Sequence, residues 1–336
     1  MARPPRRLPP IRSAGLVGRV LSRPGRSCDC YRRWVSGEAP RSIVAIGDLQ
    51  RTVLAEQLYL GRRQNDAVRE ALVRAVGAEE PDVLLLLGDQ VADGASDREW
   101  SYFDELMREL RERETAVHAL LGNHDYSRFD RLRSERNFFS RFEWMRPAEP
   151  ELVRFGDVAY LGVDSNFGVL GAERTRHQAE AFRETLAELD ADPSVRGVIV
   201  ASHHPPFSNS RLTRSAPVLD LFAKPFLAAR KTRLYLSAHV HSYERFEHEG
   251  KAFVVAGGGG GPRRRVDVSD ARPWRTDVFR GEAVRPFHYL RMSFTDDAIS
   301  VETMMLMREI PRWRLRRVDA APEFAVGDAF RIPLQE

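Results

Sequence analysis

The chain has 336 residues, of which 43% are hydrophobic and 30% are charged, and its formal net charge is +4. This length and apolar content allow a large buried core in one or two domains. The two cysteines, Cys28 and Cys30, are too few for a disulfide framework, and no apolar run approaches the roughly 20 residues of a membrane helix.

The positive charge is concentrated at the N-terminus. Residues 1–41 hold ten arginines against Asp29 and Glu38, a balance of +8, which leaves −4 for the rest of the chain. We expect residues 1–41 to form a flexible basic Pro/Arg-rich tail, in preference to an arm that binds nucleic acid or an anionic membrane. Residues 14–21 make a poor signal sequence because glycine and arginine interrupt them. The protein is therefore expected in the cytoplasm.

The first half of the chain alternates short apolar runs with stretches of helical spacing. Such alternation is typical of a parallel sheet with right-handed helical crossovers. Ser96 and Glu99 form a capping box that marks the start of a helix. Residues 130–141 are expected to form a surface helix or a lid. The sequence predicts strands at residues 43–46, 82–87 and 117–121, and a helix at residues 65–76.

The second half begins with a hairpin signal at Gly156-Asp157, between strands expected at residues 152–155 and 158–163. Pro225 is expected to kink or end a helix over residues 218–229. Further predicted elements are a helix at residues 175–189, buried strands at 198–201 and 234–236, and antiparallel strands at 252–256, 289–294 and 299–302.

Polar residues with ligand chemistry stand at the ends of these predicted strands. Ligands bind at the carboxyl ends of strands in open α/β sheets. Carboxylates, an amide oxygen and imidazoles suit Mn, Fe or Zn, and one carboxylate can bridge two ions about 4 Å apart, an arrangement that clamps both oxygens of a phosphoryl displacement. Each residue could instead cap a helix. The set consists of Asp48, Asp89, Asn123, His124, His203, His239 and His241.

The order and strand context of these motifs resemble the calcineurin-like metallophosphoesterase superfamily. The stretch from Ala238 through the glycine run ending at Gly261 is similar to its purple acid phosphatase branch. The resemblance implies an α/β four-layer sandwich of two mixed β-sheets flanked by helices, with a dinuclear site at one sheet edge. The motifs are Gly47-Asp48-x-Gln50, Gly88-Asp89, Gly122-Asn123-His124-Asp125, His203-His204-Pro205-Pro206 and His239-x-His241.

The resemblance also implies roles for these residues. Asp89 would bridge two divalent or mixed-valence ions, and a hydroxide between the ions would attack phosphorus. His124, held by Asp125, would lie beside the leaving oxygen. His204 would contact phosphoryl oxygens or serve the structure. Asp48, Gln50 and His241 would complete the first metal site, and Asn123, His203 and His239 the second.

Three positions depart from the family pattern. Gln50 stands where most members have a histidine, and an amide oxygen is a weaker ligand. Ala92 replaces the tyrosine of purple acid phosphatases, so there is no basis for a purple Fe(III) chromophore. Ala238 replaces a glycine, and its methyl group is expected to be tolerated.

The sequence thus predicts a metal-dependent phosphoesterase acting on a small or medium phosphorylated substrate. The alternatives are a phosphodiesterase or nuclease, which the net −4 body disfavours, and a non-catalytic binding module with a site weakened at Gln50. We expect the catalytic domain to span residues 42–310. Residues 311–336 form an unassigned extension, and the oligomeric state is open.

Overall fold

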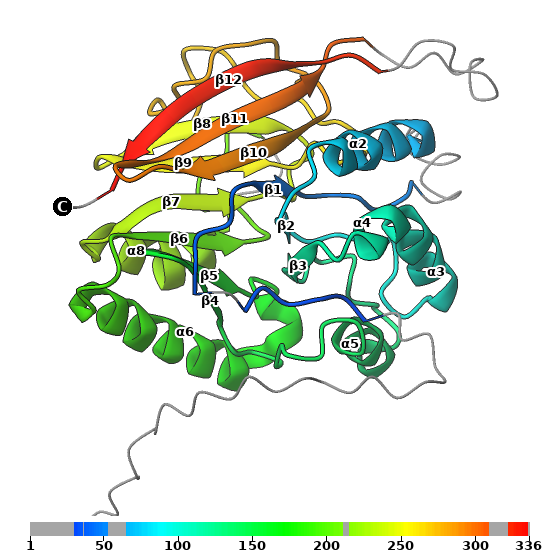
Figure 1. Ribbon diagram of the computed structural model, residues 1–336, viewed down its shortest axis with the longest axis horizontal. Coiled ribbons are helices and arrows are strands. Elements are labelled where there is room, and N and C mark those ends of the chain that lie inside the picture. The colour runs from blue at the N-terminus through cyan, green and yellow to red at the C-terminus, as the bar shows by residue number, and fades with distance from the viewer. Residues whose placement is uncertain (1–29, 36, 53–64, 211–214, 309–321, 335–336) are drawn as a thin grey trace, which may run out of the picture.

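Two six-stranded sheets face each other, and helices cover their outer faces (Figure 1). This computed structural model describes residues 30–35, 37–52, 65–210, 215–308 and 322–334. The layers follow the order helix, sheet, sheet, helix. The α/β four-layer sandwich expected from the sequence is therefore confirmed.

The first sheet has the strand order β12-β11-β10-β1-β2-β3. Its strands β1, β2 and β3 are parallel, and the other neighbours are antiparallel. The parallel half contains the three strands predicted in the first half of the sequence. The strands are β1 (Ile43–Ile46), β2 (Val83–Leu86), β3 (Ala116–Ala119), β10 (His288–Phe294), β11 (Ala298–Leu306) and β12 (Phe324–Pro333).

The second sheet has the order β4-β5-β6-β7-β9-β8. The expectation that all strands after residue 251 would be antiparallel is wrong for β9, which runs parallel to β7 and antiparallel to β8. The chain passes along the edge as β8 before it returns between β7 and β8. The strands are β4 (Glu151–Phe155), β5 (Val158–Val163), β6 (Gly197–Ser202), β7 (Thr232–Ser237), β8 (Tyr243–His248) and β9 (Lys251–Ala256).

The helices begin and end where local sequence signals indicate. Ser96 caps α3, because its Oγ accepts a hydrogen bond from the Glu99 backbone N–H at 3.3 Å. Pro225 is the second residue of α8, directly after the π-helical segment η1, and the helix ends at Ala228, within one turn of the proline. The helices are α2 (Asp66–Ala78), α3 (Asp97–Leu106), α4 (Arg108–Glu112), α5 (Arg131–Phe139), α6 (Phe167–Ala191), α7 (Ala216–Val218), η1 (Leu219–Ala223) and α8 (Lys224–Ala228).

Three apolar interfaces hold the layers together. Side chains of β1 alternate between them: Ile43 and Ala45 face the second sheet, whereas Val44 and Ile46 face the helices. Trp100 of α3 is fully buried in the helix-facing cluster. The third cluster packs α6 and η1 on the outer face of the second sheet. The strands that carry the candidate ligands are thus buried on both faces and hold their ends rigidly.

Folded structure is present on both sides of residues 42–310, the range expected for the catalytic domain. Tyr31 is buried, its N–H donates to the Arg141 carbonyl at 3.0 Å, and its hydroxyl donates to Asp104. Strand β12 pairs along β11. Residues 1–29 and 309–321 lie outside the described residues, so the flexibility expected of the basic tail stays a prediction. Among the described helices, none is long and apolar enough to cross a membrane.

Asp328 of β12 connects the two sheets. It accepts hydrogen bonds from the Tyr243 hydroxyl at 2.8 Å and from Arg245 Nε at 2.7 Å, both on β8. The side chains of Asp328 and Arg245 are 11% and 13% exposed, so this ion pair is shielded from water. Arg245 also contacts Glu247, whose side chain is 60% exposed.

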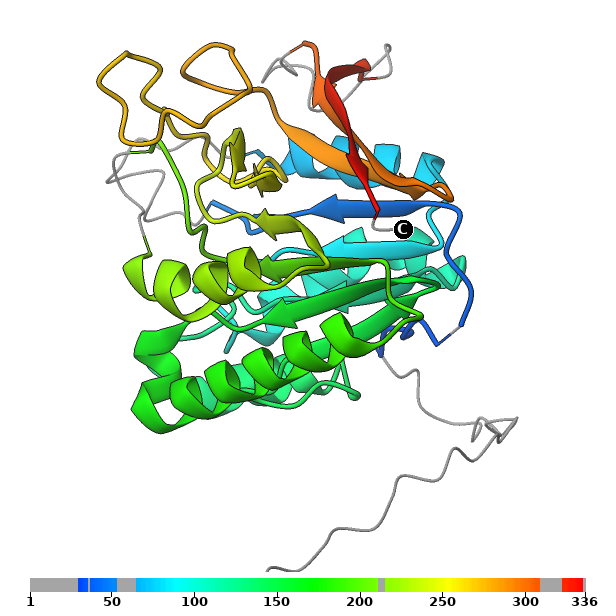
Figure 2. The same ribbon diagram turned by 90° about the vertical axis from the view of Figure 1, so that its left-hand side faces the viewer.

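A buried carboxylate anchors the long segment 257–287, which lies at the end of the sheets to which the parallel strands point (Figure 2). Glu244 accepts hydrogen bonds from Ser208 Oγ and from the Asn209 N–H, each at 2.7 Å. The Asn209 side chain in turn makes two hydrogen bonds with the Trp274 backbone. Burial raises the pKa of Glu244 to about 7.

We expect Asp328→Ala to lower the free energy of unfolding by about 2 to 4 kcal/mol, because it leaves the shielded Arg245 guanidinium without its main partner. Glu247→Ala removes the exposed partner of the same arginine and should cost less than about 1 kcal/mol. Urea unfolding followed by circular dichroism measures both. Equal effects of the two substitutions would contradict the assignment of Asp328 as the connection between sheets.

The raised pKa of Glu244 predicts a pH-dependent stability. Between about pH 4.5 and 7 the folded state holds a proton that the unfolded state releases, so this contribution is lost as the pH rises through 7. Relative to Glu244→Gln, the wild type should lose about 1 to 3 kcal/mol between pH 5 and 8. Thermal unfolding at several pH values measures the difference, with the exposed Glu247→Gln as control. A constant offset between wild type and Glu244→Gln would refute the prediction.

Candidate metal centre

Two sets of potential ligands meet at the carboxyl ends of the parallel strands. One consists of Asp89, His203 and His239, and the other of Asp48, Asp89 and His241; within each set the ligand atoms all lie within 4.8 Å of one another. Asp89 belongs to both. The structure therefore brings together five of the seven expected metal ligands, from the ends of β1, β2, β6 and β7.

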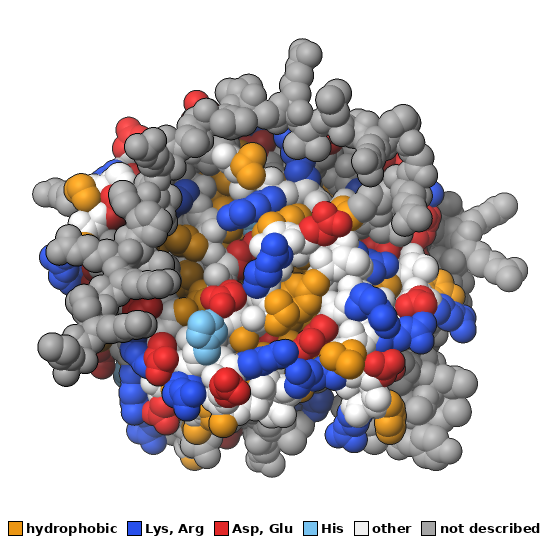
Figure 3. Space-filling model, turned by 90° about the horizontal axis from the view of Figure 1, so that it is seen from below, with side chains coloured by type: hydrophobic (Ala, Val, Ile, Leu, Met, Phe, Trp, Pro, Cys, Tyr) orange, Lys and Arg blue, Asp and Glu red, His pale blue; other side chains and the backbone are white. Residues whose placement is uncertain are grey.

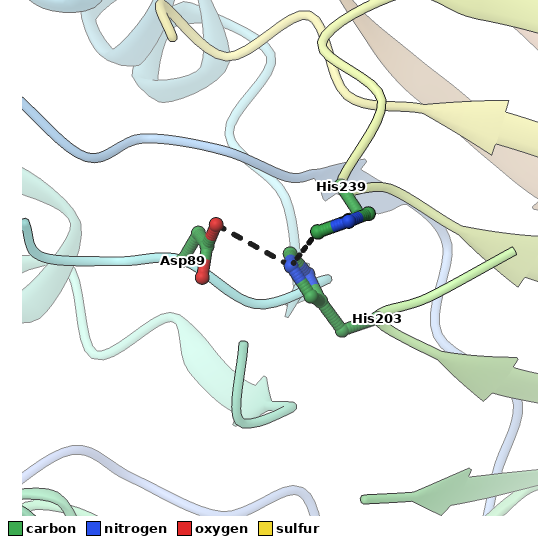
Figure 4. Close-up of side chains that lie close together, drawn as sticks. All are labelled: Asp89, His203 and His239. Atoms are coloured by element: carbon green, nitrogen blue, oxygen red, sulfur yellow. Dashed lines mark hydrogen bonds and ion pairs between the residues drawn. The ribbon is translucent and has the colours of Figure 1, made fainter. Parts of the chain in front are cut away.

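In the set drawn in Figure 4, His203 lies between the other two residues. Its Nε2 is 3.4 Å from Asp89 Oδ2 and 3.2 Å from His239 Nδ1. In the other set, His241 Nε2 is 3.8 Å from Asp48 Oδ1. Two ligands on one ion, each about 2.1 Å from it, are separated by roughly 3 to 3.5 Å. The spacings around His203 fit such a pair.

Backbone carbonyls orient the imidazole rings. His203 Nδ1 is 2.8 Å from the Leu87 carbonyl oxygen, and His241 Nδ1 is 3.0 Å from that of Pro262. Each contact requires a proton on Nδ1, so in the neutral ring the Nε2 lone pair points into the site. Fixing a ligand histidine through its other nitrogen is the usual arrangement in metal sites.

The backbone at the site is strained in a consistent way. Asp48, Asp89, His239 and His241 all have positive φ, at 61°, 56°, 68° and 50°. Non-glycine residues avoid this region, and each costs of order 1 kcal/mol or more. The strained geometry is maintained by the rigid strand ends and turns the four side chains toward a common point.

Two glycines allow the backbone to approach the carboxylates closely. A Cβ at Gly257 would lie 2.3 Å from Asp48 Oδ2, and one at Gly122 would lie 2.2 Å from Asp89 Oδ1. Neither distance is sterically possible for a side chain. This explains one position of the glycine run and the glycine that precedes Asn123.

Burial and mutual charge perturb the titration of the site. Burial raises the pKa of Asp48 well above its usual range; the charge of His203 lowers this pKa, and the charge of Asp89 raises it. Burial alone would also raise the pKa of Asp89, but the neighbouring imidazoles of His203 and His124 hold it well below the usual range. Burial lowers the pKa of His239 to about 2 and that of His241 to about 4, so both rings are neutral at pH 7.

The residues present fit bound cations. Both carboxylate oxygens of Asp48 are buried without a hydrogen-bond donor of normal geometry among the described residues. A buried carboxyl group without such donors stays ionised only if a cation compensates its charge, and otherwise takes up a proton, as the raised pKa of Asp48 indicates. The remaining donors, a second carboxylate and neutral imidazoles, are those that Mn, Fe and Zn accept.

Asn123 and Gln50 are the remaining two of the seven expected ligands. The Asn123 side chain is exposed, although the N–H of His124, the next residue, donates to Asp89 Oδ1 at 2.7 Å. Its role as a ligand stays a prediction. The Gln50 side chain is buried, and its amide lies between Asp89 and His241.

Asp125 does not hold the His124 ring, so that expectation is wrong. Its carboxylate instead accepts four backbone hydrogen bonds, from the N–H groups of Asp89, Gln90, Val91 and Gly122. The backbone at the ends of β2 and β3 supplies four N–H donors to this carboxylate, whereas the His124 ring could supply only one. Asp125 thus fixes the loop of Asp89 against that of His124.

His124 is oriented by a carbonyl instead. Its Nδ1 is 3.1 Å from the backbone oxygen of Ala92, the position at which purple acid phosphatases carry tyrosine. Ala92 therefore contributes to the site through its backbone alone. Ala238, where the family has glycine, is fully buried in the core.

The sequence did not identify the partner of His204. Ser165 Oγ contacts His204 Nδ1 at 2.8 Å and accepts a hydrogen bond from the His204 N–H at 3.0 Å. The polar run Asp164-Ser165-Asn166 at the end of β5 was the available signal. The carbonyls of Leu87, Pro262 and Ala92 left none, because their side chains take no part.

Similar folds occur in several solved structures. Purple acid phosphatase PPD1 from yellow lupin (Lupinus luteus) seeds has a TM-score of 0.63 at 14% identity, over 89% of this chain and 55% of that one. GAP50, the anchor in the inner membrane complex of Plasmodium, has a TM-score of 0.61 at 12% identity, over 89% and 90%. A dimetal phosphatase from Danio rerio has 0.52 at 15% identity, over 78% and 95%.

These likenesses show the fold, and the chain spans only about half of the lupin phosphatase. No curated protein sequence matches the chain. A family model does: that of the calcineurin-like phosphoesterases matches residues 41–243, which is more than half of the chain and includes every candidate ligand. The chain belongs to the calcineurin-like phosphoesterase family.

Proposed function

We propose that this protein is a metal-dependent phosphoesterase that hydrolyses a small or medium phosphorylated substrate. The observation that carries the proposal is the shared position of Asp89, whose Oδ2 faces both ligand sets. Such sharing suits two neighbouring cations better than one. When bound, the ions would supply Lewis-acid stabilisation of the phosphoryl oxygens and a water of lowered pKa as the nucleophile.

The chain's own residues would hold and orient this centre. Asp48, Gln50 and His241 would bind one ion, His203, His239 and Asn123 the other, and Asp89 both. The donation of the His124 N–H to Asp89 Oδ1 keeps Oδ2 directed into the site. The two metal ions can be Mn, Fe or Zn. A cytoplasmic location stays a prediction of the sequence.

His124 would act on the substrate. Its Nδ1 is committed to the Ala92 carbonyl, so Nε2 can give a proton to the leaving oxygen only from the doubly protonated ring. In that state the ring also stabilises negative charge on the leaving group. A general acid of this kind contributes about 10²- to 10⁴-fold to the rate.

The nuclease alternative has less support. The face over α5 and α6 carries acidic and basic side chains side by side (Figure 3). On these helices, Arg174 pairs with Glu135, and His177 pairs with Glu149. A strand of nucleic acid binds a stripe of one sign with aromatic platforms. The non-catalytic alternative keeps the likeness to the Plasmodium anchor in its favour.

Turnover should depend on added metal and on Asp89. Chelator-stripped protein titrated with Mn²⁺ should hydrolyse an aryl phosphate monoester or the matching diester, and the ratio of the two rates assigns the substrate class. Asp89→Asn should lose at least about 100-fold in kcat, because both ions lose a ligand. Asp220→Asn, the same change at an exposed ion pair, should be silent. Failure of both esters with Mn²⁺, Fe²⁺ and Zn²⁺ would favour the binding module.

Turnover should also depend on the His124 side chain. His124→Ala should retain the metal content of the wild type and lose about 10²- to 10⁴-fold in kcat, because it removes the proton donor. The loss should be smaller for a substrate whose leaving group needs no proton. His177→Ala, at an exposed histidine of α6, is the control. Unchanged kcat in His124→Ala would exclude the proposed role.

A further inference from the structure

Arg69, in the first turn of α2, is a buried residue that is not a candidate ligand. It is 8% exposed, although arginine is almost never buried unless its charge is paired. The apolar side of the same helix packs in one cluster with side chains of β1 and β10, so α2 lies against the strand that leads to Asp48. A charged group in this layer is unfavourable unless its hydrogen bonds are made.

The guanidinium group of Arg69 binds the loop that follows β1. Its Nη1 donates to the Leu49 carbonyl oxygen at 3.0 Å, and its Nη2 donates to Asp66 Oδ1 at 2.6 Å. Leu49 directly follows Asp48 in this loop. Asp66 also pairs with Arg51, two residues after Leu49, at 3.4 Å. The first turn of α2 therefore holds the loop of Asp48 through a backbone carbonyl and a shared carboxylate.

The methylene groups of Arg69 lie against the glycine run. Gly260 has a φ of 130°, and a Cβ at this position would overlap Arg69 Cγ. Residue 260 must therefore be glycine as long as Arg69 keeps its place. One side chain thus contacts the glycine run with its stem and the β1 loop with its guanidinium group.

Asn65, the N-cap residue of α2, binds the same glycine. An asparagine at this position usually caps its own helix, but among the described residues its side chain makes no such bond. Its Nδ2 donates to the Gly260 carbonyl oxygen at 3.1 Å instead. The helix thus gives up a local cap for a contact with a segment 195 residues further along the chain.

These contacts hold together the two segments on which the Asp48–His241 pair depends. The glycine run also bonds to the β1 loop directly, because the Gly261 N–H donates to the Asp48 carbonyl oxygen at 3.0 Å. The next residue, Pro262, supplies the carbonyl that orients His241. Without Arg69 the run could shift against the loop, and the separation of 3.8 Å between His241 Nε2 and Asp48 Oδ1 would no longer be fixed.

We propose that Arg69 is a positioning residue for one of the two metal ions, the one that Asp48 and His241 would bind. This inference rests on the proposed metal centre. Arg69 acts on the ion through the β1 loop and the glycine run. Groups that hold metal ligands in place change metal affinity by about 10- to 100-fold when they are removed. His203 and His239 follow strands of the second sheet, so the other ion should be affected little.

Metal affinity tests the proposal without turnover. Apo protein is titrated with Mn²⁺ alone, and free Mn²⁺ is measured by electron paramagnetic resonance. Arg69→Met keeps a long unbranched side chain but removes its donors, and it should weaken one of the two Mn²⁺ sites by at least about 10-fold while the other stays within about 2-fold. The loss should be much smaller in an Asp48→Asn background, because the carboxylate that Arg69 positions is already gone.

Arg141→Met is the matched control for a general loss of stability. The Arg141 side chain is 13% exposed, and its guanidinium group binds one carboxylate, that of Asp104, and one backbone carbonyl, that of Asn137. Neither partner lies beside a candidate ligand in the sequence. Arg141→Met should therefore destabilise the fold about as much as Arg69→Met does, as measured by urea unfolding, and should change neither Mn²⁺ affinity.

Two milder variants keep the test decisive if Arg69→Met folds poorly. Arg69→Lys retains the stem and a charge, but its single ammonium group cannot reproduce both bonds of the guanidinium group, so its loss should be smaller than that of Arg69→Met. Asn65→Ala removes the hydrogen bond to Gly260 and should weaken the same Mn²⁺ site by about 2- to 10-fold.

Unchanged Mn²⁺ affinities in Arg69→Met and Asn65→Ala would overturn the proposal, and so would equal weakening of both sites. A wild type that binds no ion would remove the metal centre, and with it both this inference and the proposed function. A wild type that binds two ions yet hydrolyses no ester would contradict the proposed function alone, because the Mn²⁺ titrations would still decide the role of Arg69.

Discussion

The buried carboxylate of Asp89 is the constraint on which the site depends. It has almost no exposure to water, and its charge is stabilised by the His124 N–H and by the imidazole of His203, which come from different strand ends. An isolated carboxylate could not remain ionised at such a place. The parallel strands must therefore end at the same level for the fold to be stable, and this brings the other ligands into range.

Packing in the three apolar interfaces offsets the unfavourable backbone geometry of the candidate metal centre. Each of the four candidate ligand residues with positive φ is unfavourable. Strands buried on both faces, such as β1 and β2, cannot move to relieve the strain without opening the core. Local cost is thus offset by packing elsewhere, and the side chains are held ready for cations before any cation binds.

Backbone groups at the strand ends also hold the Gln50 amide. Its nitrogen donates to the carbonyls of Asp48 and Asp89, and its oxygen lies 3.0 Å from His241 Nε2. The strand ends therefore determine where this buried side chain lies.

The sequence by itself determined the parallel core strands and the candidate ligands, because short apolar runs followed by Asp, Asn or His place these side chains at one sheet edge. The layering of two mixed sheets was implied by the resemblance to the calcineurin-like phosphoesterases. Only the tertiary structure decided what holds them. Asp125 binds backbone N–H groups and not His124, and carbonyls of Leu87 and Pro262 orient two histidines. The tertiary structure also placed β9 beside β7 and β12 beside β11. Backbone partners and distant strand pairings carry no side-chain pattern, so local sequence cannot reveal them.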